Sequence, residues 1–194
     1  MTSIINASTV AGVVVSSDTS GNLAIQSNGT TIATAQSTGL SISSYTPATS
    51  LITSGTAQAS TSGTSITFTG IPSWVKRITM MLIGVSSNGT NNFQVQIGSG
   101  SLEATGYTCV ISTGTTSTTG YVINSGSGAN TWTGNIVFTL VGSNLWTITG
   151  SLANAAGGTS QFGAGNKTTS STLDRIGITT VDTFDAGSIN ILYE

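Results

Sequence analysis

The chain has 194 residues, of which only 5% are charged, against about 25% in ordinary soluble domains. It has a formal net charge of −2, no histidine and a single cysteine, Cys109. These counts exclude a disulfide within the chain, catalytic or zinc sites that need a histidine from the same chain, and nucleic-acid binding through a basic patch.

Serine, threonine, glycine and asparagine take the place of the missing charges. A neutral surface of this kind is typical of large, stable assemblies and of secreted β-rich proteins, because soluble monomers usually depend on surface charge. Apolar residues make up 37% of the chain and gather in strand-like runs, which predicts an ordered fold. No stretch approaches the roughly 20 apolar residues that cross a bilayer, and the start lacks the basic segment of a signal peptide. We therefore expect synthesis in a cytoplasm and no membrane insertion.

Residues 1–48 are predicted to form a separate, β-rich stem. They contain one charged residue, Asp18, and short clusters of small apolar side chains. Asn28-Gly29, flanked by alternating residues, is a hairpin signal. Because a few thin strands cannot bury a core alone, we expect this segment to be a trimeric stem or docking segment that builds its core from several copies. The alternative is an extra hairpin layer on the main domain.

Residues 46–63 are rich in Pro, Ser, Thr and Gly, which indicates either a linker or the edge strand of the domain that follows. From there, strand patterns recur between turn residues, and no segment carries a helical stripe. A clear hairpin joins two apolar strands through Gly142-Ser143-Asn144. We therefore predict an all-β chain whose residues 49–194 form an antiparallel, jelly-roll-like β-sandwich. The predicted strands lie in residues 64–70, 76–87, 92–99, 106–113, 120–125, 134–142, 145–153, 171–181 and 187–194.

The few charged residues are expected to be structural. Lys76-Arg77 is the one adjacent basic pair, and we expect it to pair with Asp174 or Asp185 across the sandwich. Asp174-Arg175 supplies a second opposite-charge pair. Exposed pairs of this kind contribute about 0–1 kcal/mol each, so their expected role is to fix strand register or a subunit contact, with ligand contact as the alternative.

Asp182 and Asp185 form the most site-like acidic pair. They could act as the catalytic acids of a glycosidase, bind calcium, or support a turn. The spacing D-x-x-D alone favours neither the catalytic nor the calcium-binding role. We expect turn chemistry, with Asp185 capping the entry to the last strand. The glycine-rich loops lack the spacing of a phosphate-binding loop. The sequence thus predicts no catalytic residue, no cofactor and no metal.

Aromatic residues beside amides and hydroxyls are a common carbohydrate-contact pattern. Trp132, in the loop-like stretch GANTWTGN, and Tyr121 are therefore the candidate surface-ligand contacts. Aromatic residues are more common in protein cores than at ligand sites, so a core position is the alternative for Trp132 and Tyr121.

Two parts of the sequence, a C-terminal module and the N-terminal start, resemble bacteriophage tail-fibre and related virion proteins. SGTSITFTGIPSWVKRITMMLIGVSSNG, with LDRIGITTVDTFDAGSINILYE far downstream, is similar to a module found at the C-termini of such proteins. The start, MTSIINASTVAGVVVSSDTSGNLAIQSNGTT, separately resembles tail-fibre N-termini. The resemblance covers most of the chain and is weakest through residues 100–165. It implies a virion structural protein, a homotrimer with an N-terminal anchor, and it gives no catalytic residue.

The expected function follows from the stem, the neutral surface and this resemblance. We expect a short homotrimeric fibre, made in the host bacterial cytoplasm and located in the virion. Residues 1–48 would bind tail or capsid proteins, and the head would contact the host surface, with surface polysaccharide as the ligand. The alternative is a capsid decoration, cement or head-fibre protein. A polysaccharide depolymerase would need more acids than the chain offers, so we expect no enzyme, and a secreted adhesin would need a signal peptide.

Overall fold

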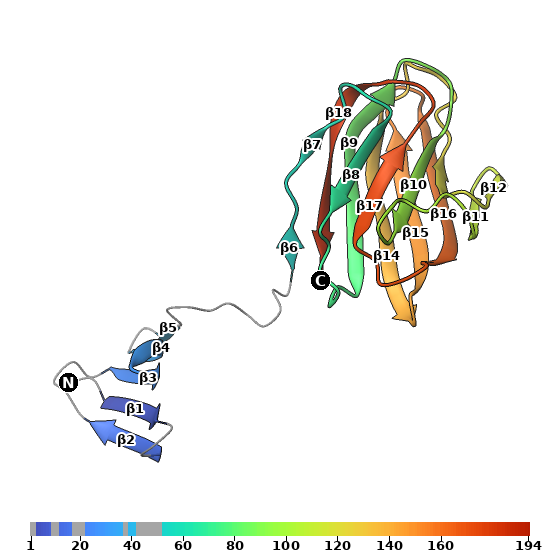
Figure 1. Cartoon of the computed structure of the whole chain (residues 1–194). Coiled ribbons are helices and arrows are strands. Elements are labelled where there is room, and N and C mark those ends of the chain that lie inside the picture. Colours follow the sequence, from blue (N-terminus) through green and yellow to red (C-terminus); the bar gives the residue numbers. More distant parts are fainter. Residues whose placement is uncertain (1–2, 9–11, 17–21, 37–38, 42–51) are drawn as a thin grey trace. The chain divides into compact units, whose positions relative to one another are not determined.

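The computed structural model describes residues 3–8, 12–16, 22–36, 39–41 and 52–194, and every regular element in these ranges is a β-strand (Figure 1). The predicted all-β class is therefore confirmed. The chain divides into two compact units, residues 1–50 and 51–194, so the division falls at residue 50 rather than at the expected 48. Each unit is described by itself.

The described residues of the first unit form a five-stranded sheet with the order β2-β1-β3-β4-β5. β1 and β3 run parallel, and the other neighbours are antiparallel. Asn28 and Gly29 join β3 to β4 with φ angles of 50° and 76°, the conformation of a type I′ hairpin turn. This confirms the predicted hairpin. The strands are β1 (Ser3–Ser8), β2 (Gly12–Ser16), β3 (Leu23–Ser27), β4 (Thr30–Gln36) and β5 (Gly39–Ser41).

The side chains described on β3 and β4 of the first unit are mostly not buried in a single copy. Of the side chains described in residues 22–35, only Ala24 is a buried apolar one. Ile25 and Ile32 remain 38% and 40% exposed. Large apolar side chains on so small a sheet are normally covered, because a sheet must bury one face against another layer.

The second unit contains two sheets (Figure 1). The four-stranded sheet has the order β13-β10-β17-β8, and the nine-stranded sheet has the order β12-β11-β16-β15-β14-β9-β18-β6, with β7 also paired to β18. The strands of the first are β8 (Ser65–Thr69), β10 (Phe93–Gly98), β13 (Tyr121–Ile123) and β17 (Arg175–Thr179). Those of the second are β6 (Thr53–Ser54), β7 (Gln58–Ala59), β9 (Arg77–Ser87), β11 (Tyr107–Ile111), β12 (Thr116–Ser117), β14 (Trp132–Gly142), β15 (Leu145–Asn154), β16 (Thr159–Thr168) and β18 (Phe184–Tyr193).

The pairing has the nested pattern of a jelly roll. The first strands, β6 and β7, pair with the last, β18, and then β8 pairs with β17, β9 with β14, and β10 with β13. All these pairs are antiparallel, and along each arm of this framework, from β7 to β10 and from β13 through β14 and β17 to β18, the strands alternate between the sheets as in a rolled-up hairpin. β15, β16, β11 and β12 extend one sheet beyond this framework. The segment that was expected to be a linker or an edge strand therefore supplies an edge strand.

The core lies between the two sheets of the second unit. Strand β9 shows the alternation that creates it, because Ile78, Met80 and Leu82 are buried while the residues between them face outward. Phe93 and Phe184 meet at one end of the core with ring centroids 5.5 Å apart. Cys109 is also buried, as its apolar surroundings predict.

The expected charge pairing across the sandwich is wrong. Arg77 Nη1 contacts the Glu194 carboxylate at 3.1 Å, and the same two residues exchange backbone hydrogen bonds that continue the β9–β18 ladder. Asp174 is instead bound by its neighbour Arg175, at 2.7 Å. Asp174 immediately precedes β17 and Arg175 begins it, so the pair is local, and this second expected pair is confirmed.

Candidate functional site

Neither aromatic residue predicted to contact a surface ligand lies on the surface. Trp132 is 3% exposed and Tyr121 is 0% exposed. Trp132 begins β14 as an inward-facing residue, so its loop-like sequence context was misleading. Tyr121 lies in β13, pairs with Val95 and packs against Gly150. Both rings are core residues, which is the alternative that their sequence left open.

The turn chemistry predicted for the acidic pair belongs to Asp182 rather than to Asp185. Asp182 accepts hydrogen bonds from the backbone N–H and the side-chain amide of Asn91, at 2.7 and 2.8 Å. It thereby ties the loop after β17 to the loop after β9. Asp185 is an exposed residue inside β18, not a turn cap. Within the described ranges, no group of three or more His, Cys, Asp or Glu side chains is placed to hold a metal ion.

The Asp182–Asn91 contact borders a surface depression of about 370 Å³. Its position is set by β10, by the end of β17 and by the loops that the contact joins. Ser125 N donates to Asn92 Oδ1 at 3.2 Å, and Thr119 Oγ1 donates to Gln94 Oε1 at 3.2 Å, so both amides are oriented by their oxygen atoms. The lining residues are Asn91, Asn92, Gln94, Thr179, Thr180 and Val181.

The lining of this depression is polar but uncharged. Within residues 52–194, the side-chain NH₂ groups of Asn92 and Gln94 have no hydrogen-bond partner and can donate to a ligand. Val181, which is 82% exposed, supplies an apolar contact at the rim. Amide donors beside a small apolar surface can bind the hydroxyl groups and C–H faces of a neutral sugar. They supply no general acid or base.

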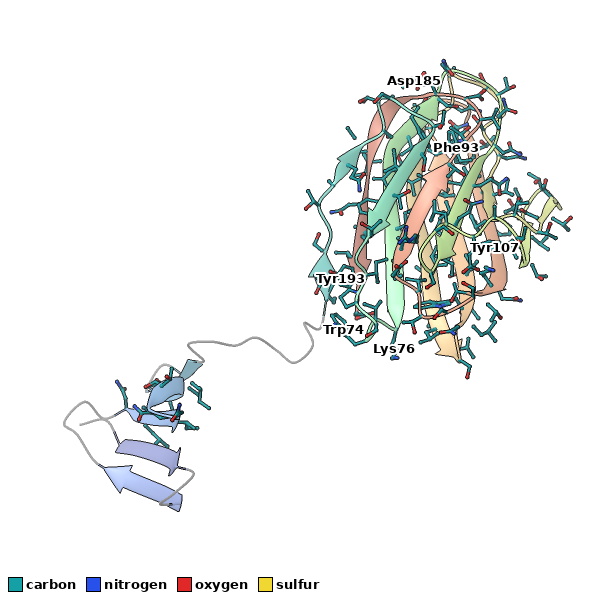
Figure 2. All side chains as sticks on the ribbon, in the orientation of Figure 1. Trp74, Lys76, Phe93, Tyr107, Asp185 and Tyr193 are labelled. Carbon is teal, nitrogen blue, oxygen red and sulfur yellow. The ribbon has the colours of Figure 1, made fainter. Side chains whose placement is uncertain are left out.

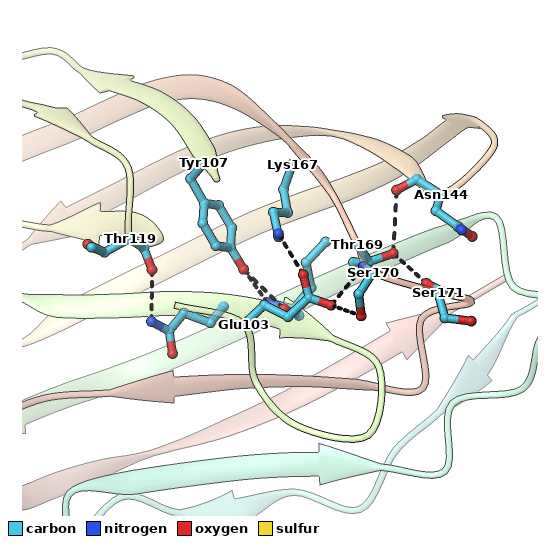
Figure 3. Close-up of polar contacts among 10 residues, drawn as sticks. Glu103, Tyr107, Thr119, Asn144, Lys167, Thr169, Ser170 and Ser171 are labelled. Carbon is cyan, nitrogen blue, oxygen red and sulfur yellow. Dashed lines mark hydrogen bonds and ion pairs between the residues drawn. The ribbon is translucent and has the colours of Figure 1, made fainter. Parts of the chain in front are cut away.

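A second polar cluster lies inside the sandwich and was not predicted from the sequence (Figure 3). Lys167 on β16 contacts the Glu103 carboxylate at 2.6 Å, with the two side chains only 7% and 15% exposed. Ser170 donates to the other carboxylate oxygen from its backbone N–H and its hydroxyl, at 2.9 and 2.7 Å. Burial raises the pKa of Glu103, but the bonds from Lys167 and Ser170 outweigh it and leave this pKa below its usual value.

The same cluster binds the end of strand β10. The Tyr107 hydroxyl accepts a hydrogen bond from Ile97 N and donates to Ile97 O, at 2.8 and 3.1 Å. Burial raises the pKa of Tyr107, and Lys167 Nζ lies 5.4 Å from the ring centroid. Farther along β16, Gln161 accepts from Asn124 N and donates to Val122 O on strand β13. These side chains satisfy backbone groups that have no partner strand, so the cluster is structural.

Glu103 and Lys167 lie 64 positions apart in the sequence, so local spacing gave no signal for their contact. Within the described ranges, the structure contains no helix that could span a membrane. Comparisons with protein-family models, curated proteins and solved structures found no match to the chain.

Proposed function

We propose that the chain is a bacteriophage virion structural protein. In this proposal it forms a short homotrimeric fibre, anchored to the particle through residues 1–48, and its β-sandwich head attaches to the host surface. The protein acts by binding and has no enzymatic activity. The proposal rests on the composition, on the resemblance to fibre termini and on two structural observations.

The observation that carries the proposal is the exposure of large apolar side chains on β3 and β4 of the first unit. Ile25 and Ile32 remain substantially exposed in one copy, while Ala24 is the one buried apolar side chain described there. Other copies of the chain, or a neighbouring virion protein, would cover these residues. A segment that completes its fold only in an assembly suits a stem or an anchor.

The second observation concerns the two ends of the head. The chain enters the head at β6, which pairs with Leu192 and Tyr193 at the end of β18. The polar depression lies beside the start of β18, about ten residues and roughly 30 Å away along the strand. In Figure 2 the labels of Tyr193 and Asp185 mark these two ends. The depression therefore lies at the end of the head opposite to the point where the chain enters it.

A single head would bind its ligand weakly through this depression, because the depression is shallow and neutral. Three copies presented together would strengthen binding through multivalency, without any new contact. A neutral polysaccharide on the host surface is the ligand class that amide donors and an apolar rim favour.

Deletion of residues 1–48 tests the anchor. Particles assembled with the truncated chain should lack the head, and images of wild-type particles should show it at the tail. Normal incorporation of the truncated chain would overturn the anchor assignment. If the images showed the protein spread over the capsid shell, the attachment function would be wrong. The alternative, a decoration protein that stabilises the shell, would replace it.

The Gln94→Ala variant tests the depression. Purified wild-type protein should compete with particles for adsorption to host cells, and Gln94→Ala should compete at least tenfold less well. Thr67→Ala is the control, because Thr67 also faces outward on the four-stranded sheet but does not line the depression. Equal competition by both variants would place the binding surface elsewhere on the head.

A further inference from the structure

The nine-stranded sheet has a broad, neutral outer face, which we define as the outward residues of β9, β14, β15, β16 and β18. These five strands contain three charged residues, Arg77, Lys167 and Asp185. Lys167 points inward, and the other two lie at strand ends. Outward positions of a solvated sheet normally carry many charges, so this face is unusual for a surface in water.

Cross-strand register shows what replaces the charges. One row across the outer face consists of Ala164, Thr149, Val137, Thr79 and Leu192. The next row contains Phe162 and Met81, and Ile83 follows in the row beyond. Phe162 and Ile83 are 64% and 65% exposed. Threonine hydroxyls can pair with one another without any charge, and the methyl and apolar groups between them favour burial.

Part of the outward face of the other sheet is covered by the chain itself. Gln96 and Val122 point away from the core, yet they are 6% and 3% exposed. Gln96 donates to Thr119 O at 2.8 Å, and Leu102 lies over Gly177. Loops thus cover part of this outward face, and no comparable loop cover lies on the outer face of the nine-stranded sheet within residues 52–194.

The edges of the nine-stranded sheet are poor places for association. It ends in β12 on one side and in β6 on the other, each of two residues. Such short edge strands give another chain little backbone to pair with. The outer face is far larger: five strands about 4.8 Å apart and about 33 Å long cover roughly 800 Å², the share of one partner in a standard interface.

We propose that the outer face is the contact between copies of this chain, with the outer faces of the three heads turned toward one another. This inference rests on the homotrimer of the proposed function and adds the surface that forms it. Other copies of the chain would also cover the exposed isoleucines of the first unit. Copies joined through the first unit would be held near one another, which raises the effective concentration of the heads.

Thiol protection in the full chain tests the surface. Thr149→Cys places a reactive thiol in the central row, and Val181→Cys places one at an exposed loop as the control. The native Cys109 contributes little background because it is buried and its pKa is raised to about 11. We expect Thr149→Cys to react with a maleimide at least tenfold more slowly than Val181→Cys. Adding Val137→Glu should abolish this protection, because three like charges would meet at the contact.

Light scattering on the same samples separates the outcomes. The wild-type protein should have about three times the mass of one chain, which is 19.4 kDa. Equal reaction rates of the two cysteine variants would overturn the proposed contact, even if the protein is trimeric and present in virions. A protected Thr149→Cys thiol in a single-chain species would also overturn it, because the chain's own residues would then cover the face. Circular dichroism verifies that Val137→Glu remains folded.

Discussion

Lys167 and Glu103 form the least exposed of the ion pairs among the described residues. Their side chains are 7% and 15% exposed, whereas those of Arg77 and Glu194 are 52% and 39% exposed. Burial makes removal of one partner costly, because the other charge stays in a site with little water. The pair also holds Lys167 against Tyr107, whose hydroxyl binds strand β10. Its expected contribution is therefore to fix how the extended sheet lies on the smaller one.

We predict that Glu103→Gln lowers the free energy of unfolding by about 3 kcal/mol at neutral pH. The variant keeps an oxygen atom that can accept from Ser170 but leaves the Lys167 charge unpaired. The double variant Glu103→Gln, Lys167→Met should lose less than the sum of the single losses, since it leaves no unpaired charge. Urea denaturation measures these differences. Glu194→Gln is the matched control and should cost less than about 1 kcal/mol, because its pair is exposed. Equal losses for Glu103→Gln and Glu194→Gln would contradict the buried role.

The lowered pKa of Glu103 predicts a loss of stability in acid. The folded protein holds the carboxylate charged more strongly than the unfolded chain does, so the stabilisation is fully present above the usual value of 4.5 and declines as the pH falls through the lower, folded pKa. Asp174 acts in the same direction, because the bond from Arg175 lowers its pKa, although it is more exposed. Urea midpoints measured from pH 7 to pH 2 should fall more steeply for the wild type than for Glu103→Gln. Parallel curves would assign the acid response to other groups.

At the scale of elements, strand β16 shows where sequence patterns fail. Its inward positions are Gln161, Gly163, Gly165 and Lys167, while Phe162 faces outward. This pattern reverses the apolar-in, polar-out alternation from which strands are recognised. The polar residues point inward because they bind backbone groups and Glu103, contacts made with segments far away in sequence. The strand is therefore absent from the prediction, although the two strands that precede it in the chain, β14 and β15, follow the ordinary alternation and were predicted.

Sequence patterns also fail to predict the candidate site, because its residues come from segments far apart in the sequence. Strand alternation and turn residues predicted the sandwich and the Ser143-Asn144 hairpin. The edge strand before β8 was one of two alternatives for its segment, the other being a linker. The depression, however, is formed by loops after β9 and β17 that meet through Asp182 and Asn91. The order of strands in the two sheets decides which loops meet. Local patterns in a single sequence do not reveal that order. Trp132 was misplaced for a related reason, because its glycine-rich surroundings resembled an exposed loop.

Glycines in β16 allow it to approach β11, and this leads to a prediction for the extension of the sheet. A Cβ at Gly165 would collide with Cys109 Sγ and Thr108 O. Gly165→Ala should therefore separate β11 from β16 and lower the free energy of unfolding by about 1–3 kcal/mol. Cys109 reports the change, since its thiol is buried in the wild type and should react faster with a disulfide reagent in the variant. Ala164→Ser, at the neighbouring outward position, should change neither quantity. An unchanged Cys109 rate in Gly165→Ala would show that the strands adjust without separating.

At the scale of the whole molecule, the two units differ in what they need from other chains. The head has its own core between two sheets, whereas the described side chains of the first unit include one buried apolar residue. We therefore predict two transitions in calorimetry, with the midpoint of the first unit rising with chain concentration, because binding among copies stabilises only the folded form. Ile32→Asp should lower that midpoint by at least about 5 °C and leave the head transition unchanged. Thr30→Asp, an exposed residue on the same strand, is the control. If Ile32→Asp and Thr30→Asp gave the same midpoint, and that midpoint did not depend on concentration, contacts between copies would not be the source of the first unit's stability.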